Sequence, residues 1–250
     1  MDLSSRTVLV TGGGSGQGAD LAHQLAETGA TVHITGRRAE ALQAVAGAHP
    51  NIHAHQADMT EEAAVKALYA DIGPAQIVIA NAGMAESAPL HRTSLESWQQ
   101  IMAVNLTAVF LTFREGLQAL RAEKQEWGRF IAIASIAGLR GYPYVSAYAA
   151  SKHGVIGLVK SAALENARAG FTFNAICPGY LDTEMTDRTL DNIMEKTGKS
   201  RDEARDALTA MNPQGRLIQP AEVTRMALFL CGPNTDSITG QALSVSGGET

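Results

Sequence analysis

The sequence predicts an α/β fold in which helices cover both faces of a doubly wound parallel sheet. Two observations support this prediction: short β-branched runs alternate with longer helical patterns, and polar or glycine-rich residues follow several of the runs. In a sheet of this kind such residues meet, because ligands bind at the carboxyl ends of the strands. The predicted strands, about seven in number, are Thr7–Val10, Thr31–Thr35, Asn51–His55, Gln76–Ala80, Phe130–Ala134, Thr172–Cys177 and Ala242–Val245.

The segments between the predicted strands carry apolar residues at the spacing of amphipathic helices. A polar, helix-prone segment, Thr186–Met211, breaks the alternation, and we interpret it as an insertion that forms a lid over the substrate. Neither a linker nor a repeat divides the chain, so we expect residues 1–250 to form a single domain. The expected helices are Gly16–Thr28, Ala39–Ala46, Glu61–Asp71, Ser97–Arg121, Ala147–Ala169 and Ala221–Leu230.

Composition and charge argue against several classes of protein. The 250 residues, 45% of them hydrophobic, are enough to bury a substantial core. A formal net charge of −5, with no cluster of Lys and Arg, argues against a nucleic-acid-binding surface. No apolar run is long enough to span a membrane and no signal-peptide pattern is present, so we expect no membrane partner and a cytoplasmic location. Cys177 and Cys231 are expected to be reduced, and no residue pattern indicates a metal site.

A glycine-rich stretch joins the first predicted strand to the first predicted helix. The eight residues TGGGSGQG, Thr11 to Gly18, contain five glycines but do not have the spacing G-x-G-x-x-G. Free backbone N–H groups at a helix N-terminus attract an anion, and glycine lets a pyrophosphate approach closely. The stretch therefore indicates a nucleotide site, with a tight strand-to-helix connection that binds nothing as the alternative.

Three further residues indicate acid–base chemistry. Ser135 follows the fifth predicted strand, and Tyr148 and Lys152 share one face of the next helix because they are four residues apart. A phenol has an ordinary pKa of about 10, which a neighbouring ammonium group lowers. We expect Ser135 to hold a substrate oxygen, Tyr148 to exchange a proton with it, and Lys152 to lower the pKa of Tyr148 and contact a cofactor ribose. The alternative is a packed tyrosine, an extended lysine and a turn serine.

The complete set of motifs, in chain order, is Thr11-Gly12-x-x-x-Gly16-x-Gly18, Asn81-Ala82-Gly83, Asn105, Ser135, Tyr148-x-x-x-Lys152 and Pro178-Gly179. This set resembles the single-domain short-chain dehydrogenase/reductase family over essentially the whole chain. The resemblance implies a Rossmann-type fold and an oxidoreductase whose glycine-rich turn cradles the pyrophosphate of a nicotinamide dinucleotide. It also implies that Asn105 serves a proton relay from Lys152 to solvent, through its side chain or through a local helix irregularity that holds a water.

The resemblance also assigns residues to the cofactor. Asp58 is expected to contact the adenine and Thr183 to bind the nicotinamide carboxamide, although both could be simple caps. The full set of expected cofactor contacts is Gly12, Ser15, Gly16, Gln17, Gly18, Arg37, Arg38, Asp58, Asn81, Gly83, Tyr148, Lys152, Pro178, Gly179 and Thr183.

The residues after the second predicted strand indicate which nicotinamide cofactor is used. An NAD-binding chain of this fold usually places a carboxylate there to bind the ribose hydroxyls, but this chain has Gly36, followed by Arg37 and Arg38. A guanidinium group pairs well with the 2′-phosphate of NADP, so we expect NADP rather than NAD. Ser15 stands against this expectation, because many NADP-dependent relatives carry a basic residue there.

The substrate is defined less sharply than the cofactor. Tyr142, Tyr180 and Met194 favour an apolar or aromatic ketone over a sugar, and Arg140 is a candidate anchor for an anion. The second half of the chain is similar to β-ketoacyl-thioester and aromatic polyketide ketoreductases, which implies a β-ketoacyl or β-hydroxyacyl thioester. A free aromatic or alicyclic alcohol is the alternative substrate. A catalytically silent nucleotide-sensing regulator is the alternative from another class.

The predicted helix Ala147–Ala169 has apolar residues on more than the one face that a sheet can cover. The resemblance implies that this helix and the preceding long helix pair across a two-fold axis, and that the last helix and strand form a second contact. We therefore expect a homotetramer, with a dimer as the fallback.

Overall fold

The computed structural model describes all of residues 1–250 and confirms the predicted parallel sheet. Seven strands lie in the order β3-β2-β1-β4-β5-β6-β7, and each neighbouring pair is parallel. The order reverses between β1 and β4, where open sheets of this kind leave a crevice for a ligand. The strands are β1 (Thr7–Thr11), β2 (Thr31–Gly36), β3 (Ile52–Gln56), β4 (Ile77–Ala80), β5 (Gly128–Ile133), β6 (Phe171–Pro178) and β7 (Ala242–Val245).

Helices connect the strands with bounds close to those expected. The predicted helix Ser97–Arg121 is the exception, because a π-helical turn at Ala103–Thr107 interrupts it. Sequence periodicity does not reveal such a turn, since one widened turn barely shifts the apolar pattern. None of the helices combines the length and the apolar character needed to cross a membrane. They are α1 (Gly16–Glu27), α2 (Ala39–Ala46), α3 (Glu62–Ile72), α4 (Leu95–Met102), α5 (Ala108–Ala122), α6 (Ser146–Asn166), α7 (Glu184–Thr197), α8 (Arg201–Thr209) and α9 (Pro220–Cys231).

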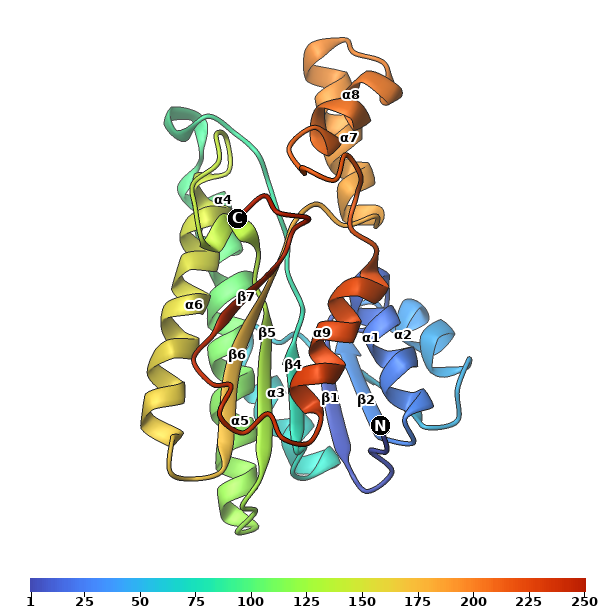
Figure 1. Cartoon of the computed structure of the whole chain (residues 1–250), viewed down its shortest axis with the longest axis vertical. Helices are drawn as coiled ribbons and strands as arrows, with labels where there is room; N and C mark the ends of the chain where they lie inside the picture. The colour runs from blue at the N-terminus through green and yellow to red at the C-terminus, as the bar shows by residue number, and fades with distance from the viewer.

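The core consists of two apolar layers, one on each face of the sheet. Helices α3, α5 and α6 cover one face, and α1, α2 and α9 cover the other (Figure 1). Successive side chains of a strand point to opposite faces, so Leu9 packs in the first layer while Val8 and Val10 pack in the second. Burial on both faces also explains why β4, with the sequence IVIA, is apolar at every position.

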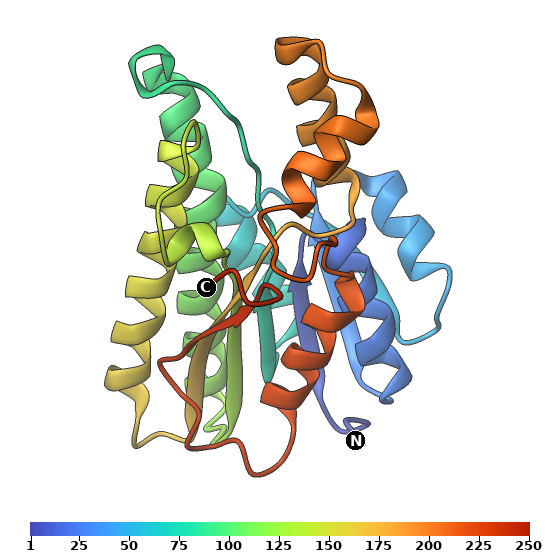
Figure 2. The ribbon, with the colours of Figure 1, turned by 45° about the horizontal axis from the view of Figure 1, so that its top comes forward.

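Helices α7 and α8 form an arm that projects beyond the sheet (Figure 2). This arm contains most of the predicted insertion Thr186–Met211. It has a small core of its own, in which Leu190 packs against Ala204 and Leu208, and Arg201 forms an ion pair with Asp191 at 2.8 Å. The two helices of the arm are therefore held to each other by contacts within the arm itself.

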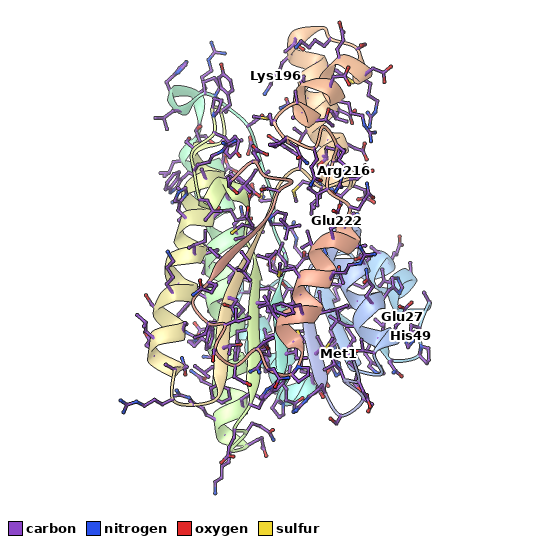
Figure 3. All side chains as sticks on the ribbon, viewed as in Figure 1. Met1, Glu27, His49, Lys196, Arg216 and Glu222 are labelled. Atoms are coloured by element: carbon purple, nitrogen blue, oxygen red, sulfur yellow. The ribbon has the colours of Figure 1, made fainter.

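The arm is fastened at its base and touches the body at one further place. At the base, both terminal nitrogens of Arg216 donate to the carboxylate of Glu222 at the start of α9, at 2.6 and 2.8 Å (Figure 3). On α7, Nζ of Lys196 donates to the carbonyl oxygen of Ser87 at 3.2 Å (Figure 3), and Nδ2 of Asn192 donates to the Ser87 hydroxyl at 2.8 Å. These bonds join α7 to the loop that follows β4.

Candidate active site

The glycine-rich turn between β1 and α1 is packed so tightly that its glycines cannot be replaced freely. Gly12 and Gly16 have positive φ angles of 67° and 50°, a conformation that favours glycine. A Cβ atom on Gly18 would lie 2.1 Å from the carbonyl oxygen of Gly12, and one on Gly13 would lie 2.6 Å from Cβ of Ile34. The turn therefore brings bare backbone to the N-terminus of α1, as anion binding requires.

Asn81 fixes this turn to the end of β4. Its Nδ2 donates to the carbonyl oxygens of Thr11 at 3.0 Å and Gly12 at 3.3 Å. In return, the Thr11 hydroxyl accepts from the backbone N–H groups of Asn81 and Ala82, both at 3.0 Å. These four bonds hold the ends of β1 and β4 together at the point where the strand order reverses.

The end of β2 carries positive charge next to the glycine-rich turn. Gly36 ends the strand, and Arg37 and Arg38 that follow are exposed. Nη2 of Arg38 donates to the Ser15 hydroxyl at 2.9 Å. Ser15 stands against NADP because many NADP-dependent relatives have a basic residue at this position. The bond brings the positive charge of Arg38 to that position instead.

Two other predicted cofactor residues, Gln17 on α1 and Thr183 before α7, differ in where their side chains point. The side chain of Gln17 points to α9, where its Nε2 donates to the Thr224 hydroxyl at 2.8 Å, so only its backbone N–H faces the turn region. Thr183 precedes α7 and lies against the turn, since a Cβ on Gly16 would be 3.4 Å from its methyl group. The structure thus brings Thr183 and Gly16 together and directs the Gln17 side chain elsewhere.

The remaining predicted residues lie at the carboxyl ends of β3 and β6. The carboxylate of Asp58 accepts from the backbone N–H and the hydroxyl of Thr60, at 3.0 and 2.7 Å. Pro178 ends β6, and the N–H of Gly179 donates to the carbonyl oxygen of Val245 at 3.0 Å. Asp58 therefore makes the bonds of a local turn before α3, whose N-cap is Glu61, and Gly179 is held between β6 and β7.

The expected acid–base residues converge at the carboxyl ends of β4 and β5. Ser135 lies two residues after the end of β5, and its hydroxyl accepts from the N–H of Ala137 at 3.1 Å. Tyr148 and Lys152 lie in the first two turns of α6, as the four-residue spacing predicts. A Cβ on Gly83, after β4, would lie 3.6 Å from Nζ of Lys152. Residues distant in sequence thus surround one point near the glycine-rich turn.

Burial dominates the protonation of this group. It raises the pKa of Tyr148 above its ordinary value, and the nearby Ser135 hydroxyl offsets this only in part. Burial also lowers the pKa of Lys152 to about 8. Nζ of Lys152 donates to the carbonyl oxygen of Ile133 at 2.9 Å and lies 5.7 Å from the centre of the Tyr148 ring. The lowering of the Tyr148 pKa that we expected from Lys152 is therefore not present in this structure.

Asn105 lies in the π-helical turn and is completely buried. Its Oδ1 accepts from the N–H of Met84 at 2.8 Å, and its Nδ2 donates to the carbonyl oxygen of Met84 at 2.9 Å and the Ser151 hydroxyl at 3.1 Å. The side chain is thus occupied in joining the π-helical turn to α6 and to the loop after β4. The helix irregularity that the sequence left open as one of two options is thus present at Asn105, and the proton relay itself stays a prediction.

On the substrate side, the structure corrects the expectation that Arg140 anchors an anion. Nη2 of Arg140 donates to Oε1 of Glu249 at 2.6 Å, and the Tyr142 hydroxyl donates to the same oxygen at 2.6 Å. The positive charge is therefore already paired. Sequence reasoning missed Glu249, and no local signal identifies it, because Arg140 and Glu249 are 109 positions apart.

A group of histidines lies at the sheet edge formed by β2 and β3. His53 and His55 alternate on β3, and the structure adds His33 from β2, whose Nδ1 lies 2.9 Å from Nε2 of His55. Nδ1 of His55 in turn lies 3.2 Å from the carboxylate of Asp71. No group of three or more histidine, cysteine or acidic residues is arranged to hold a metal ion. Burial, followed by the charges of the neighbouring histidines, lowers the pKa of His33 to about 4.

Comparison with known proteins places these features in a family. The family model described as short chain dehydrogenase matches residues 6–193. A 3-oxoacyl-(acyl-carrier-protein) reductase of Rickettsia bellii is 34% identical over 249 residues, which are 99% of this chain and 98% of the relative. A D-beta-hydroxybutyrate dehydrogenase of Cupriavidus necator is 35% identical over 255 residues, and 98% of each chain is covered.

The solved structures give the same result at the level of the fold. The structure of a variant of actinorhodin polyketide ketoreductase with NADPH superimposes with a TM-score of 0.93 at 34% sequence identity. The match covers 100% of this chain and 99% of the other. The fold of this chain is thus that of a known polyketide ketoreductase.

Proposed function

Since this chain belongs to the short-chain dehydrogenase family, we propose that it is an NADP(H)-dependent oxidoreductase that interconverts a ketone and a secondary alcohol. One observation carries the proposal: Ser135, Tyr148 and Lys152 meet beside a strand-to-helix turn that only glycine can form. An acid–base group next to an anion-binding turn is what ketone reduction with a dinucleotide needs.

The residues present fit NADP. The cradle at Gly12, Gly13 and Gly18 leaves no room for a Cβ atom, so a pyrophosphate would meet backbone N–H groups directly. Arg37 and Arg38 would hold the 2′-phosphate by charge-assisted hydrogen bonds. Gly36 supports the choice of NADP over NAD, because a carboxylate at that position would repel the phosphate.

The roles in the reaction follow from chemistry and burial. In the direction of reduction, Ser135 holds the carbonyl oxygen and Tyr148 donates its phenolic proton to it. The raised pKa of Tyr148 keeps the phenol protonated at neutral pH, which is the state that donation requires. When bound, the reduced nicotinamide supplies the hydride that the carbonyl carbon receives. Lys152, whose Nζ lies 5.7 Å from the centre of the Tyr148 ring, is the positive charge that would approach the phenolate once the proton has left.

Restoring the proton on Tyr148 requires a path from solvent. We assign this path to Lys152 and to the π-helical turn Ala103–Thr107, which contains Asn105. A π-turn leaves a backbone carbonyl without its usual α-helical partner, and a water bound there would lie next to the lysine side of the site. The Asn105 side chain holds the loop at Met84 and so keeps this region in place.

We propose a β-ketoacyl or β-hydroxyacyl thioester as the substrate, with a free aromatic or alicyclic ketone as the alternative. The support comes from relatives named for acyl-carrier-protein and polyketide substrates and from aromatic side chains at Tyr142 and Tyr180. The α7–α8 arm is proposed as the lid that covers this substrate. Its start directly after Thr183 and its bonds to Ser87 across the crevice support this role.

We also propose that the protein assembles as a homotetramer. Large apolar side chains are exposed on the helices that the resemblance assigns to the two contacts: Phe110 on α5, Leu164 on α6 and Phe229 on α9 are 42%, 82% and 54% exposed. Sedimentation velocity is expected to show a species of four chains. A monomer at micromolar concentration would contradict the assembly.

The function is tested by initial rates of NADPH and NADH oxidation with a neutral β-ketoacyl thioester, an aromatic ketone and a sugar. We expect turnover of the thioester with NADPH and a lower kcat/KM with NADH. A protein that binds NADPH but reduces none of these compounds would instead fit the nucleotide-sensing alternative.

A further inference from the structure

Arg140, Tyr142 and Glu249 form a closed network on the substrate side of the crevice. Arg140 donates through Nε to the Tyr142 hydroxyl at 2.8 Å, through Nη2 to Oε1 of Glu249 at 2.6 Å, and through Nη1 to the Glu249 carbonyl oxygen at 3.2 Å. The Tyr142 hydroxyl donates to Oε1 of Glu249 as well. Arg140 and Tyr142 belong to the loop before α6, and Figures 1 and 2 both show the end of the chain, after β7, beside that loop.

In this network Glu249 faces the protein interior and Arg140 faces solvent. The side chain of Arg140 is 46% exposed, whereas that of Glu249 is only 3% exposed. Oε1 of Glu249 takes both hydrogen bonds, and its other oxygen, Oε2, lies 3.8 Å from the place of a Cβ on Gly179. The charge of Glu249 also reaches Tyr180, whose pKa is raised by burial and then by this carboxylate. The carboxylate, rather than the guanidinium, therefore faces Gly179 and Tyr180.

This arrangement determines which charge an incoming substrate meets. A β-ketoacyl thioester and a free β-keto acid share the same reacting carbonyl but differ by one negative charge close to it. A buried carboxylate repels that charge strongly, because the surroundings screen it less than water does. The positive charge that could attract an anion is bound to Glu249 and lies farther out.

We infer that Glu249 is a specificity-determining residue, which makes this enzyme select neutral β-ketoacyl compounds and reject free β-keto acids by holding a buried negative charge beside Gly179 and Tyr180 and by pairing Arg140. The inference rests on the proposed function and names the charge class of its substrate. It assigns a role in substrate choice to a residue 101 positions beyond Tyr148, supplied by the segment after β7.

The test compares acetoacetate, a free acid, with S-acetoacetyl-N-acetylcysteamine, a neutral thioester, by kcat/KM with NADPH. Glu249→Gln keeps the shape of the side chain and removes its charge, which leaves the charge of Arg140 unpaired. We expect this variant to raise the ratio of acid to thioester turnover about tenfold, the effect of one charge-assisted contact. Adding Arg140→Gln is expected to abolish the gain. Glu27→Gln, the same change at an exposed residue at the end of α1 (Figure 3), is the matched control and leaves the ratio unchanged.

The possible failures are distinguishable. If the wild-type protein reduces acetoacetate as efficiently as the thioester, or if Glu249→Gln leaves the ratio unchanged while the thioester is still reduced, the role of Glu249 is refuted and the proposed function stands. If neither compound is reduced by any variant, the proposed β-ketoacyl substrate is refuted and the assignment of Glu249 fails with it, while the aromatic-ketone assay decides whether the oxidoreductase function stands.

Discussion

The cofactor side of the site is formed mainly by closely packed backbone, whereas the substrate side is formed by long side chains. On the cofactor side, Gly13 and Gly18 pack against Ile34 and Gly12 so closely that no atom can be added. On the substrate side, long side chains make the contacts: Arg140 with Glu249, and Lys196 with the loop after β4. A site built from backbone resists change, whereas one built from side chains changes with a single substitution. The fold can thus keep one cofactor chemistry while its substrates vary.

The largest expected effect is at the point where the two sides meet. Tyr148→Phe removes the proton donor while leaving the ring in place, so kcat is expected to fall by about a hundredfold or more. NADPH affinity, measured by fluorescence titration, should be retained. Tyr69→Phe is the matched control, because the Tyr69 hydroxyl donates to the carbonyl oxygen of Thr112 between α3 and α5, and its loss should affect stability alone. Substantial remaining activity in Tyr148→Phe would remove Tyr148 from the mechanism.

A single methyl group added to the glycine-rich turn on the cofactor side should distort that turn. In Gly18→Ala the new Cβ would start 2.1 Å from the carbonyl oxygen of Gly12, so the turn must move. We expect a loss of about 3 kcal/mol in the free energy of unfolding and weaker NADPH binding. Gly157→Ala, where nothing lies within 4 Å of the added Cβ, is the control for thermal denaturation. Equal melting temperatures for the two variants would show that the turn is not closely packed.

The difference between the backbone-built cofactor side and the side-chain-built substrate side also explains which features could be predicted from the sequence. The glycine-rich turn, the Tyr148–Lys152 spacing and the strand–helix alternation depend on local rules, and the structure has each of them at the predicted place. The pairing of Arg140 with Glu249 depends on two side chains that only the complete fold brings together. The helix irregularity at Asn105 is one of the two options that the resemblance implies, but apolar periodicity could not reveal it, because a widened turn preserves the pattern that periodicity detects.

A smaller effect should separate the two nicotinamide cofactors. Arg37→Ala removes a guanidinium from the end of β2, and the loss of one charged contact should weaken NADPH binding by about 2 kcal/mol, roughly thirtyfold. NADH binding should hardly change, because NADH lacks the 2′-phosphate. Arg168→Ala, at an exposed position after α6, tests for a general charge effect. An NADPH-to-NADH affinity ratio that stays at the wild-type value would show that Arg37 does not contact the phosphate.

The smallest expected effect is the pH dependence of the stability, which His33 on β2 causes at the sheet edge formed by β2 and β3. The pKa of His33 is about 4 in the folded protein, below its ordinary value of 6.5, so the unfolded chain binds the proton more readily. Stability should therefore fall as the pH drops from 6.5 towards 4, by about 1 kcal/mol after allowing for screening of a half-exposed imidazole. His33→Thr should flatten this part of the urea-denaturation profile, while His91→Gln, at an exposed position, should not. A profile unchanged by His33→Thr would contradict the assignment.

The most direct test of ketone reduction is to follow the hydride itself. NADPH carrying deuterium at the transferable position of nicotinamide C4 is incubated with the neutral β-ketoacyl thioester, and the product is analysed by mass spectrometry and NMR. The account predicts one deuterium, bound to the carbon of the new secondary alcohol, in the wild-type protein and essentially no product in Tyr148→Phe. NADPH that binds without transferring deuterium to this thioester or to any other ketone would contradict it.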